Sequence, residues 1–191
     1  DKLTVWASTQ SPFGLQDTLV REFGTTIEKV RVITPFLGGG FGGKASSQQG
    51  VEAARLARMA DKPVMLAWTR EEEFMYDAFH PASVIKVKSG IDSTGKIMLW
   101  DYSIYLAGTR GSEATYDIPN VRITNYREDP TKYPVHPFAT GPWRAPNNNS
   151  NTFARETQID IMAAAAGADP LEFRLRNLKD ERMTGVLKAV A

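Results

Sequence analysis

A run of five glycines within six positions constrains this chain more than any other feature. The run is Gly38-Gly39-Gly40-Phe41-Gly42-Gly43, and Lys44 follows it directly. A strand-like stretch over 30–37 leads into the run, and a helical pattern over about 46–60 leaves it. Glycine backbone bends freely and its N–H groups can approach an anion closely, while the start of a helix adds partial positive charge. The sequence therefore predicts a backbone cradle for an anionic group.

Bulk composition narrows the possible partners. The chain has 191 residues, enough for one substantial core or two small lobes, and a net charge of +1. That charge gives no electrostatic reason to expect nucleic acid or an anionic membrane surface as a partner. No apolar run approaches the roughly 20 residues of a membrane span. Cysteine is absent, so this sequence offers no ligands for an iron–sulfur cluster. Each of its two histidines precedes a proline, and we expect both to be structural.

Strand and helix patterns alternate through the first half of the chain. A helix is expected to begin at Ser11-Pro12, an N-cap followed by proline, and to stop at Gly24. The other elements expected in this half are a strand over 3–7, the strand and helix on either side of the glycine run, a buried strand over 63–68 and a short helix over 71–79.

The second half changes to a hairpin pattern and then to helices. Strands are expected over 84–91 and 96–106, on either side of an Asp-Ser-Thr-Gly turn. Residues 107–150 are rich in proline, glycine and asparagine and are predicted to be loop. Helices are expected over 152–166, from a capping Asp169-Pro170 onward, and over 185–191. The predicted fold is α+β with a mixed sheet, a β-hairpin and packed helices, with possible lobes over 1–79 and 80–191.

Two nucleotide-binding motifs partly fit the glycine run. Gly38, Gly43 and Lys44 satisfy the P-loop spacing, but Ala45 stands where a magnesium-binding hydroxyl is required. The Rossmann spacing is also met, yet that fold needs an acidic residue at the end of the next strand, and Glu71 comes too late. A stand-alone module that binds phosphate or a nucleotide through 38–44 stays open as the alternative function.

The run also resembles the GGGFGGK motif of the molybdenum hydroxylases, the xanthine oxidase and aldehyde oxidoreductase family. Three further segments are similar to motifs of that family, in the same order: Ser-Thr-Gln-Ser-Pro at 8–12, Pro-Trp-Arg-Ala-Pro at 142–146, and the helical tail over 153–177. The residues over 63–72 and 139–144 look most like the large subunit of the isoquinoline 1-oxidoreductase branch. The resemblance covers nearly the whole chain and implies part of a molybdopterin-binding domain.

In that family a molybdenum–pterin cofactor hydroxylates an N-heterocyclic aromatic or an aldehyde, with water as the oxygen source. By match to its motifs, Gln10 would hydrogen-bond an oxygen ligand of molybdenum, and Arg144 would place a cation beside the metal centre. These two are the candidate catalytic residues. The candidate cofactor-binding residues are Gly39, Gly40, Phe41, Gly42 and Gly43. The expected cofactor is molybdopterin in its cytosine dinucleotide form. Because cysteine is absent, the iron–sulfur clusters are expected on a partner subunit or domain.

Two departures from the family pattern shape the expectation. Ala45 replaces the glutamate that many xanthine-type members carry after the motif lysine, which argues against a purine substrate. No segment matches the Gly-x-Gly-Glu that supplies the family's general base.

The chain also starts at Asp1 without methionine. We therefore expect 1–191 to be part of a longer bacterial polypeptide, inactive by itself, in the cytoplasm or periplasm.

Overall fold

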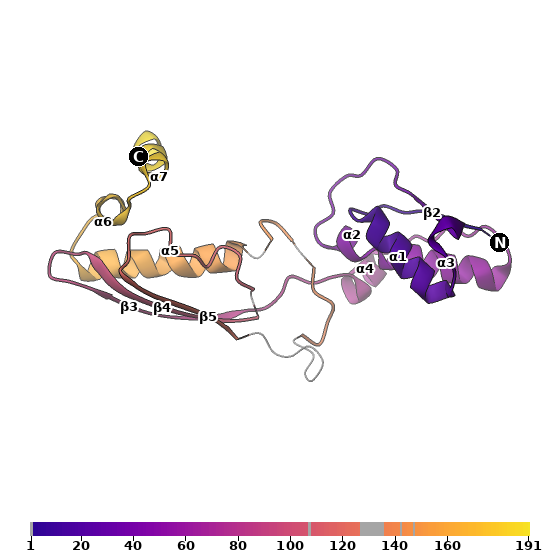
Figure 1. Cartoon of the computed structure of the whole chain (residues 1–191), viewed down its shortest axis with the longest axis horizontal. Helices are drawn as coiled ribbons and strands as arrows, with labels where there is room; N and C mark the ends of the chain where they lie inside the picture. Colours follow the sequence, from indigo (N-terminus) through magenta and orange to yellow (C-terminus); the bar gives the residue numbers. More distant parts are fainter. Residues whose placement is uncertain (1, 107, 127–135, 142, 147) are drawn as a thin grey trace. The chain divides into compact units, whose positions relative to one another are not determined.

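The computed structural model describes residues 2–106, 108–126, 136–141, 143–146 and 148–191. It divides into two compact units, the first made of residues 1–80 and 136–144 and the second of residues 81–135 and 145–191 (Figure 1). The sequence pattern placed all of 80–191 in one lobe. Residues 136–144 belong instead to the first unit, where Phe79 pairs with them. Its N–H donates to the Ala139 carbonyl at 2.8 Å, and its own carbonyl accepts from the Gly141 N–H at 3.1 Å.

The first unit is a small parallel sheet packed against helices. Its elements are β1 (Leu3–Trp6), α1 (Pro12–Phe23), the 3-10 helix η1 (Ile27–Lys29), β2 (Val30–Ile33), α2 (Gly43–Ser46), α3 (Gln48–Ala60) and α4 (Arg70–Tyr76). Strands β1 and β2 run parallel, with Leu3 opposite Val30 and Trp6 opposite Ile33. The core of this unit consists of Val5, Leu15, Leu19, Val30 and Ala54.

Local signals account for α1. Pro12 opens the helix after Ser11, apolar side chains at Leu15 and Leu19 recur four residues apart and are buried, and Gly24 ends it in the left-handed region with φ 58°. The predicted helix is therefore confirmed at both ends.

Three predictions in this unit were wrong in detail. The strand over 30–37 ends at Ile33, and 34–42 is irregular. The helix expected from about 46 begins at Gln48, because Ser47 takes φ 54° and separates it from the four-residue α2. Residues 63–68, predicted to be a buried strand, are not paired with any strand among the described residues.

The second unit is a three-stranded mixed sheet with α5 along one face (Figure 1). Its elements are β3 (Val84–Ile91), β4 (Ile97–Tyr105), β5 (Asn120–Tyr126), α5 (Asn148–Ala165), α6 (Pro170–Asn177) and α7 (Glu181–Val190). Strand β4 pairs antiparallel with β3, as the hairpin pattern predicted, and parallel with β5. Strand β5 lies inside the stretch predicted to be loop. The mixed sheet, hairpin and packed helices agree with the predicted α+β class.

Buried polar contacts fasten the helices of this unit to its sheet. Asn177 is fully buried; its side-chain oxygen accepts from the Ile97 N–H at 2.9 Å, and its amide donates to the Gly95 and Phe173 carbonyls at 3.1 and 2.9 Å. Tyr116 donates to Glu156 on α5 at 2.8 Å. Among the described residues, no helix combines the length and apolar character needed to cross a bilayer.

Candidate functional site

The structure brings Gln10 against the glycine run. The Gln10 N–H donates to the Lys44 carbonyl at 2.9 Å. A Cβ built on Gly40 would lie only 2.6 Å from the Gln10 side-chain oxygen, so the amide rests on the bare backbone of that glycine. These two sequence-predicted site residues are distant in the chain. They meet because β1 and β2 are parallel neighbours whose ends lead into them.

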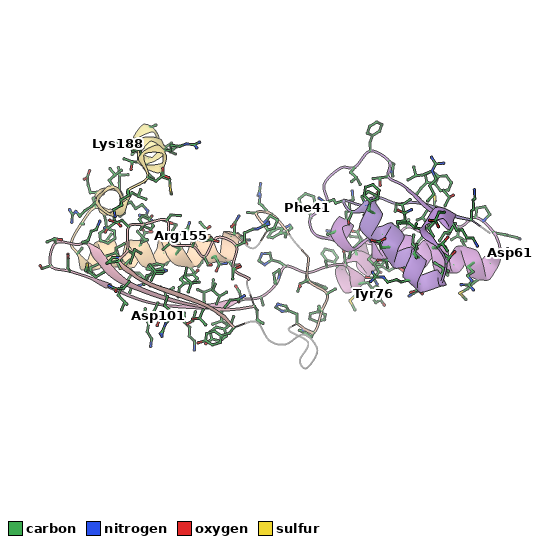
Figure 2. All side chains as sticks on the ribbon, in the orientation of Figure 1. Phe41, Asp61, Tyr76, Asp101, Arg155 and Lys188 are labelled. Atoms are coloured by element: carbon green, nitrogen blue, oxygen red, sulfur yellow. The ribbon has the colours of Figure 1, made fainter. Side chains whose placement is uncertain are left out.

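The loop backbone is bent by unusual dihedrals at its centre. Phe41 has φ 46° and Gly42 has φ 97°, both in the left-handed region that most side chains avoid. The Phe41 ring lies over Gly39, where a Cβ would overlap it, and 76% of Phe41 is exposed (Figure 2). A Cβ on Gly43 would overlap the Asp77 carboxylate. The φ of Gly42 favours glycine, whereas a Cβ on Gly39 or Gly43 would have to displace the Phe41 ring or the Asp77 carboxylate.

The amide N–H groups of the run are the chemically available feature. Among the described residues, the N–H groups of 38–42 make no hydrogen bond, whereas that of Gly43 donates to the Gly40 carbonyl at 3.0 Å. Free N–H groups on a glycine backbone can donate to an oxygen-rich or anionic ligand. This arrangement fits the pterin and metal-oxygen groups that the resemblance implies.

The segment that carries Arg144 also borders the run. A Cβ on Gly141 would lie only 2.9 Å from the Gly42 carbonyl oxygen, so the two backbones are in close contact. Trp143 meets the His80 ring edge-on with centroids 5.3 Å apart. Arg144 is three residues beyond Gly141, a span of at most about 11 Å. Its exposed guanidinium makes no hydrogen bond or ion pair within the described part of the chain. Pro142, in the same motif, lies outside the described residues.

Two supporting contacts were missed at the sequence level. Thr9 and Ser47 are buried, and the Ser47 hydroxyl donates to the Thr9 hydroxyl, which also accepts from the Ser11 N–H at 3.0 Å. This pair joins the segment of Gln10 to the residue after α2. The Asp77 carboxylate lies against Gly43 and accepts from the Ala78 N–H at 2.7 Å. Thr9 belongs to the Ser-Thr-Gln segment, so its motif was a usable signal; Ser47 and Asp77 carried none.

The expected helix-terminus contribution to anion binding was wrong. The run leads into α2, which is only four residues long, and the longer α3 starts at Gln48. A helix dipole needs several aligned peptide units, so α2 supplies little of it. The donors at this site are therefore the loop N–H groups themselves.

Neither of the two nucleotide-binding motifs has an acidic side chain at the position that it requires. A P-loop site also needs a carboxylate at the end of a strand to hold magnesium. Asp101 on β4 belongs to the second unit, where it pairs with Arg122 on the sheet face opposite α5 (Figure 2). Glu71 lies in α4 rather than at the end of a strand. Among the described residues there is also no cluster of three or more histidine or acidic side chains that could hold a metal ion. The glycine run therefore offers backbone N–H donors beside the Gln10 side-chain amide, without a carboxylate or a metal site.

Comparison with known proteins identifies the same family that the sequence motifs resemble, over nearly the whole chain. Residues 1–178 match the family model of the molybdopterin cofactor-binding domain. The chain is 26% identical over 215 residues to one subunit of the nicotinate dehydrogenase of Pseudomonas putida, covering 100% of this chain and 18% of that protein. It is 31% identical over 187 residues to the aldehyde oxidoreductase molybdenum-binding subunit of Escherichia coli, covering 93% and 25%.

The fold is also that of a solved molybdenum enzyme. Aldehyde oxidoreductase from Desulfovibrio gigas matches with a TM-score of 0.85 and 17% identity over 99% of this chain and 23% of that one. This chain thus spans a quarter or less of the length of these three proteins. Because the family model extends over nearly the entire sequence, the chain belongs to the molybdopterin cofactor-binding domain family of the molybdenum hydroxylases.

Proposed function

We propose that this chain supplies the cofactor-facing glycine loop of a molybdenum hydroxylase that acts on an N-heterocyclic aromatic or an aldehyde. The observation that supports it is the row of unpartnered N–H groups over 38–42 beside the Gln10 amide. The molybdenum–pterin group supplies two-electron oxidation of a carbon with water as the oxygen source. The residues of this chain bind, orient and enclose that group.

Each candidate residue has a distinct role in this proposal. The backbone of Gly39 to Gly42 holds the cofactor through its free N–H groups, and the Gly43 N–H fixes the shape of the loop by donating to the Gly40 carbonyl. Gln10 orients a polar ligand with a neutral amide, which adds no charge that would alter the reaction. Arg144 provides a cation near the reacting group, and the exposed Phe41 ring covers the loop against water.

The proposed substrate, pterin nucleotide, partner and general base rest on the names of the relatives and on the sequence motifs. The relatives named nicotinate dehydrogenase and aldehyde oxidoreductase support a heterocycle or aldehyde, and we assign an isoquinoline-like substrate. We further propose a cytosine dinucleotide pterin and an iron–sulfur partner, since the chain has no cysteine. The general base glutamate is assigned to residues outside the 191, so this chain alone neither retains cofactor nor turns over.

The test uses the full-length gene product. Molybdenum is measured by elemental analysis, pterin by fluorescence after oxidation, and turnover with isoquinoline, nicotinate and benzaldehyde in isotopically labelled water. We expect stoichiometric molybdenum and labelled oxygen in the product of a heterocycle or aldehyde. A protein that lacks molybdenum and pterin but is stabilised by a nucleotide would support the nucleotide-binding alternative, which the family match does not favour.

A further inference from the structure

The Gln10 side chain depends on its own backbone for its direction. Gln10 is exposed, and within the described part of the chain its side-chain amide makes no hydrogen bond. The amide oxygen nevertheless rests on the bare backbone of Gly40. The main chain sets the direction of the Cα–Cβ bond and restricts the rotamers that the side chain can adopt. Whatever keeps the amide over Gly40 must therefore act on the main chain around Gln10.

Hydrogen bonds hold the backbone on both sides of Gln10. The Gln10 N–H itself donates to the Lys44 carbonyl at 2.9 Å. On its two flanks the contacts converge on the hydroxyl of Thr9, which is only 1% exposed. This oxygen accepts from the Ser11 N–H at 3.0 Å and from the Ser47 hydroxyl. Ser47 is thus joined through Thr9 to the residues before and after Gln10.

The local backbone does not explain why position 47 is a serine. Ser47 has φ 54°, in the left-handed region where glycine is the favoured residue. It also stands at the N-cap of α3, where a serine normally accepts from the first helical N–H groups, yet its side chain makes no such cap. The Ser47 hydroxyl is used for the contact to Thr9 instead.

The position of Ser47 is fixed by α3 and by the core of the first unit. Its carbonyl accepts from the Gly50 N–H at 3.0 Å. A Cβ built on Gly50 would lie 3.0 Å from the side chain of Leu15, a core residue, and 3.3 Å from that of Ala7. This part of α3 therefore packs tightly against its neighbours. A buried hydrogen bond from such a support holds Thr9 more firmly than an exposed one would.

We propose that the Thr9–Ser47 hydroxyl pair positions Gln10 for the reaction, by fixing its main chain so that the side-chain amide stays over Gly40. This inference rests on the proposed role of Gln10, which is to orient a polar ligand of the cofactor. Thr9 and Ser47 are both buried and act through Gln10, so they are positioning residues rather than catalytic ones. A displacement of the amide by about 1 Å is enough to slow a reaction by up to about 100-fold.

Substitutions in the full-length gene product test the pair. Ser47→Ala removes one hydroxyl, and Thr9→Val removes the other with little change of shape. Both should lower kcat by about 10- to 100-fold and leave KM and the molybdenum content unchanged. Amide hydrogen exchange of Gln10 and Ser11, measured by mass spectrometry, should become faster on the order of tenfold.

Two matched variants should behave like the unmodified protein. Thr9→Ser keeps the hydroxyl and should therefore retain both the turnover and the slow exchange. Ser46→Ala removes a hydroxyl one residue away, which is exposed and makes no hydrogen bond within the described part of the chain.

Ser47→Gly separates positioning from stability. Glycine relieves the positive φ but lacks the hydroxyl, so its melting temperature should be at least that of Ser47→Ala. Its kcat and its exchange at Gln10 and Ser11 should nevertheless change as in Ser47→Ala. Thr9→Val combined with Ser47→Ala should lose little more activity than either substitution alone, because both break the same hydrogen bond.

The outcomes distinguish this inference from the proposed function. If Gln10→Ala abolishes turnover of the molybdenum-loaded enzyme while Ser47→Ala and Thr9→Val retain it, the positioning role is overturned. Recovery of kcat in Ser47→Gly together with its melting temperature also overturns it, because Ser47 would then act through stability alone. A full-length protein without molybdenum contradicts the proposed function instead. The exchange of Gln10 and Ser11 then decides: faster exchange in Ser47→Ala supports the hydroxyl pair, and unchanged exchange overturns it.

Discussion

At the residue scale, substitution of two glutamines near the start of α1 should affect turnover in one case and stability in the other. Gln10 is exposed and its side-chain amide makes no hydrogen bond within the described residues, whereas the Gln16 amide donates to the Val30 carbonyl at 2.7 Å. In the full-length enzyme, Gln10→Ala should lower turnover by about 10- to 100-fold and barely change the melting temperature. Gln16→Ala should cost about 1 kcal/mol of stability and keep the turnover. Equal losses of rate and melting temperature in Gln10→Ala would contradict its assigned role.

The glycines of the run differ in what they require. Gly42 has φ 97° and touches the Gly141 backbone, while a Cβ on Gly38 would meet nothing within 4 Å. Gly42→Ala should therefore destabilise the first unit by about 1–2 kcal/mol and reduce the molybdenum content of the full-length protein. Gly38→Ala is the matched control and should change neither. Thermal unfolding and elemental analysis of the two variants measure both effects; similar losses in the two would show that glycine is needed for chain flexibility alone.

How far the sequence predicts the site depends on the kind of contact. The glycine run and Gln10 lie in motifs, so the resemblance identified them, and the structure places them together. Asp77 and Ser47 reach the loop from other segments, and no local pattern marks them. Such contacts depend on how the chain returns on itself, which short-range propensity does not encode.

At the element scale, the accuracy of prediction follows the range of the interactions. Helix α6 was predicted from Asp169 and Pro170, and the Asp169 carboxylate does accept from the N–H groups of Leu171 and Glu172. Strand β5 is rich in polar residues and depends on its neighbour β4, so its sequence looked like loop. Residues 63–68 show the opposite case, since their apolar run is typical of a buried strand but the described chain supplies no strand that pairs with them.

Strand β4 makes the stability of the second unit sensitive to alkaline pH. Burial raises the pKa of Tyr102 from 10.0 to about 12. The folded chain then holds the phenol proton more tightly than the unfolded chain, so this stabilisation is full below pH 10 and declines between about pH 10 and 12. The loss should reach about 2–3 kcal/mol, with a further loss in the same direction from Tyr116, whose pKa burial also raises.

Denaturant unfolding at several pH values measures this effect. Tyr102→Phe should flatten the decline, although it also removes the hydroxyl contact to the Asn151 carbonyl at 3.1 Å. Tyr126→Phe, on the exposed face of the same sheet, is the control. An equally steep decline in Tyr102→Phe would assign the alkaline sensitivity to other groups.

At the scale of the whole molecule, the chain has two hydrophobic cores, each drawn from one unit. Leu19 belongs to the core of the first unit and Phe173 to that of the second, and both are 0% exposed. Each glycine-loop contact described above lies within the first unit, so the stability of the site should depend on the first core. A domain whose chemistry rests on one core can tolerate changes in the other.

Truncation of each core tests this division. Leu19→Ala should destabilise the first unit by about 2–5 kcal/mol and Phe173→Ala the second by about 3–5 kcal/mol. Hydrogen exchange measured by mass spectrometry should show faster exchange in α1, β2 and α3 for the first variant, and in β4, α5 and α6 for the second. Only Leu19→Ala should also speed exchange of the hydrogen-bonded amides of Gln10 and Gly43. Acceleration across both units by either substitution would mean that the two cores unfold as one, and the glycine loop would then depend on the entire chain for its shape.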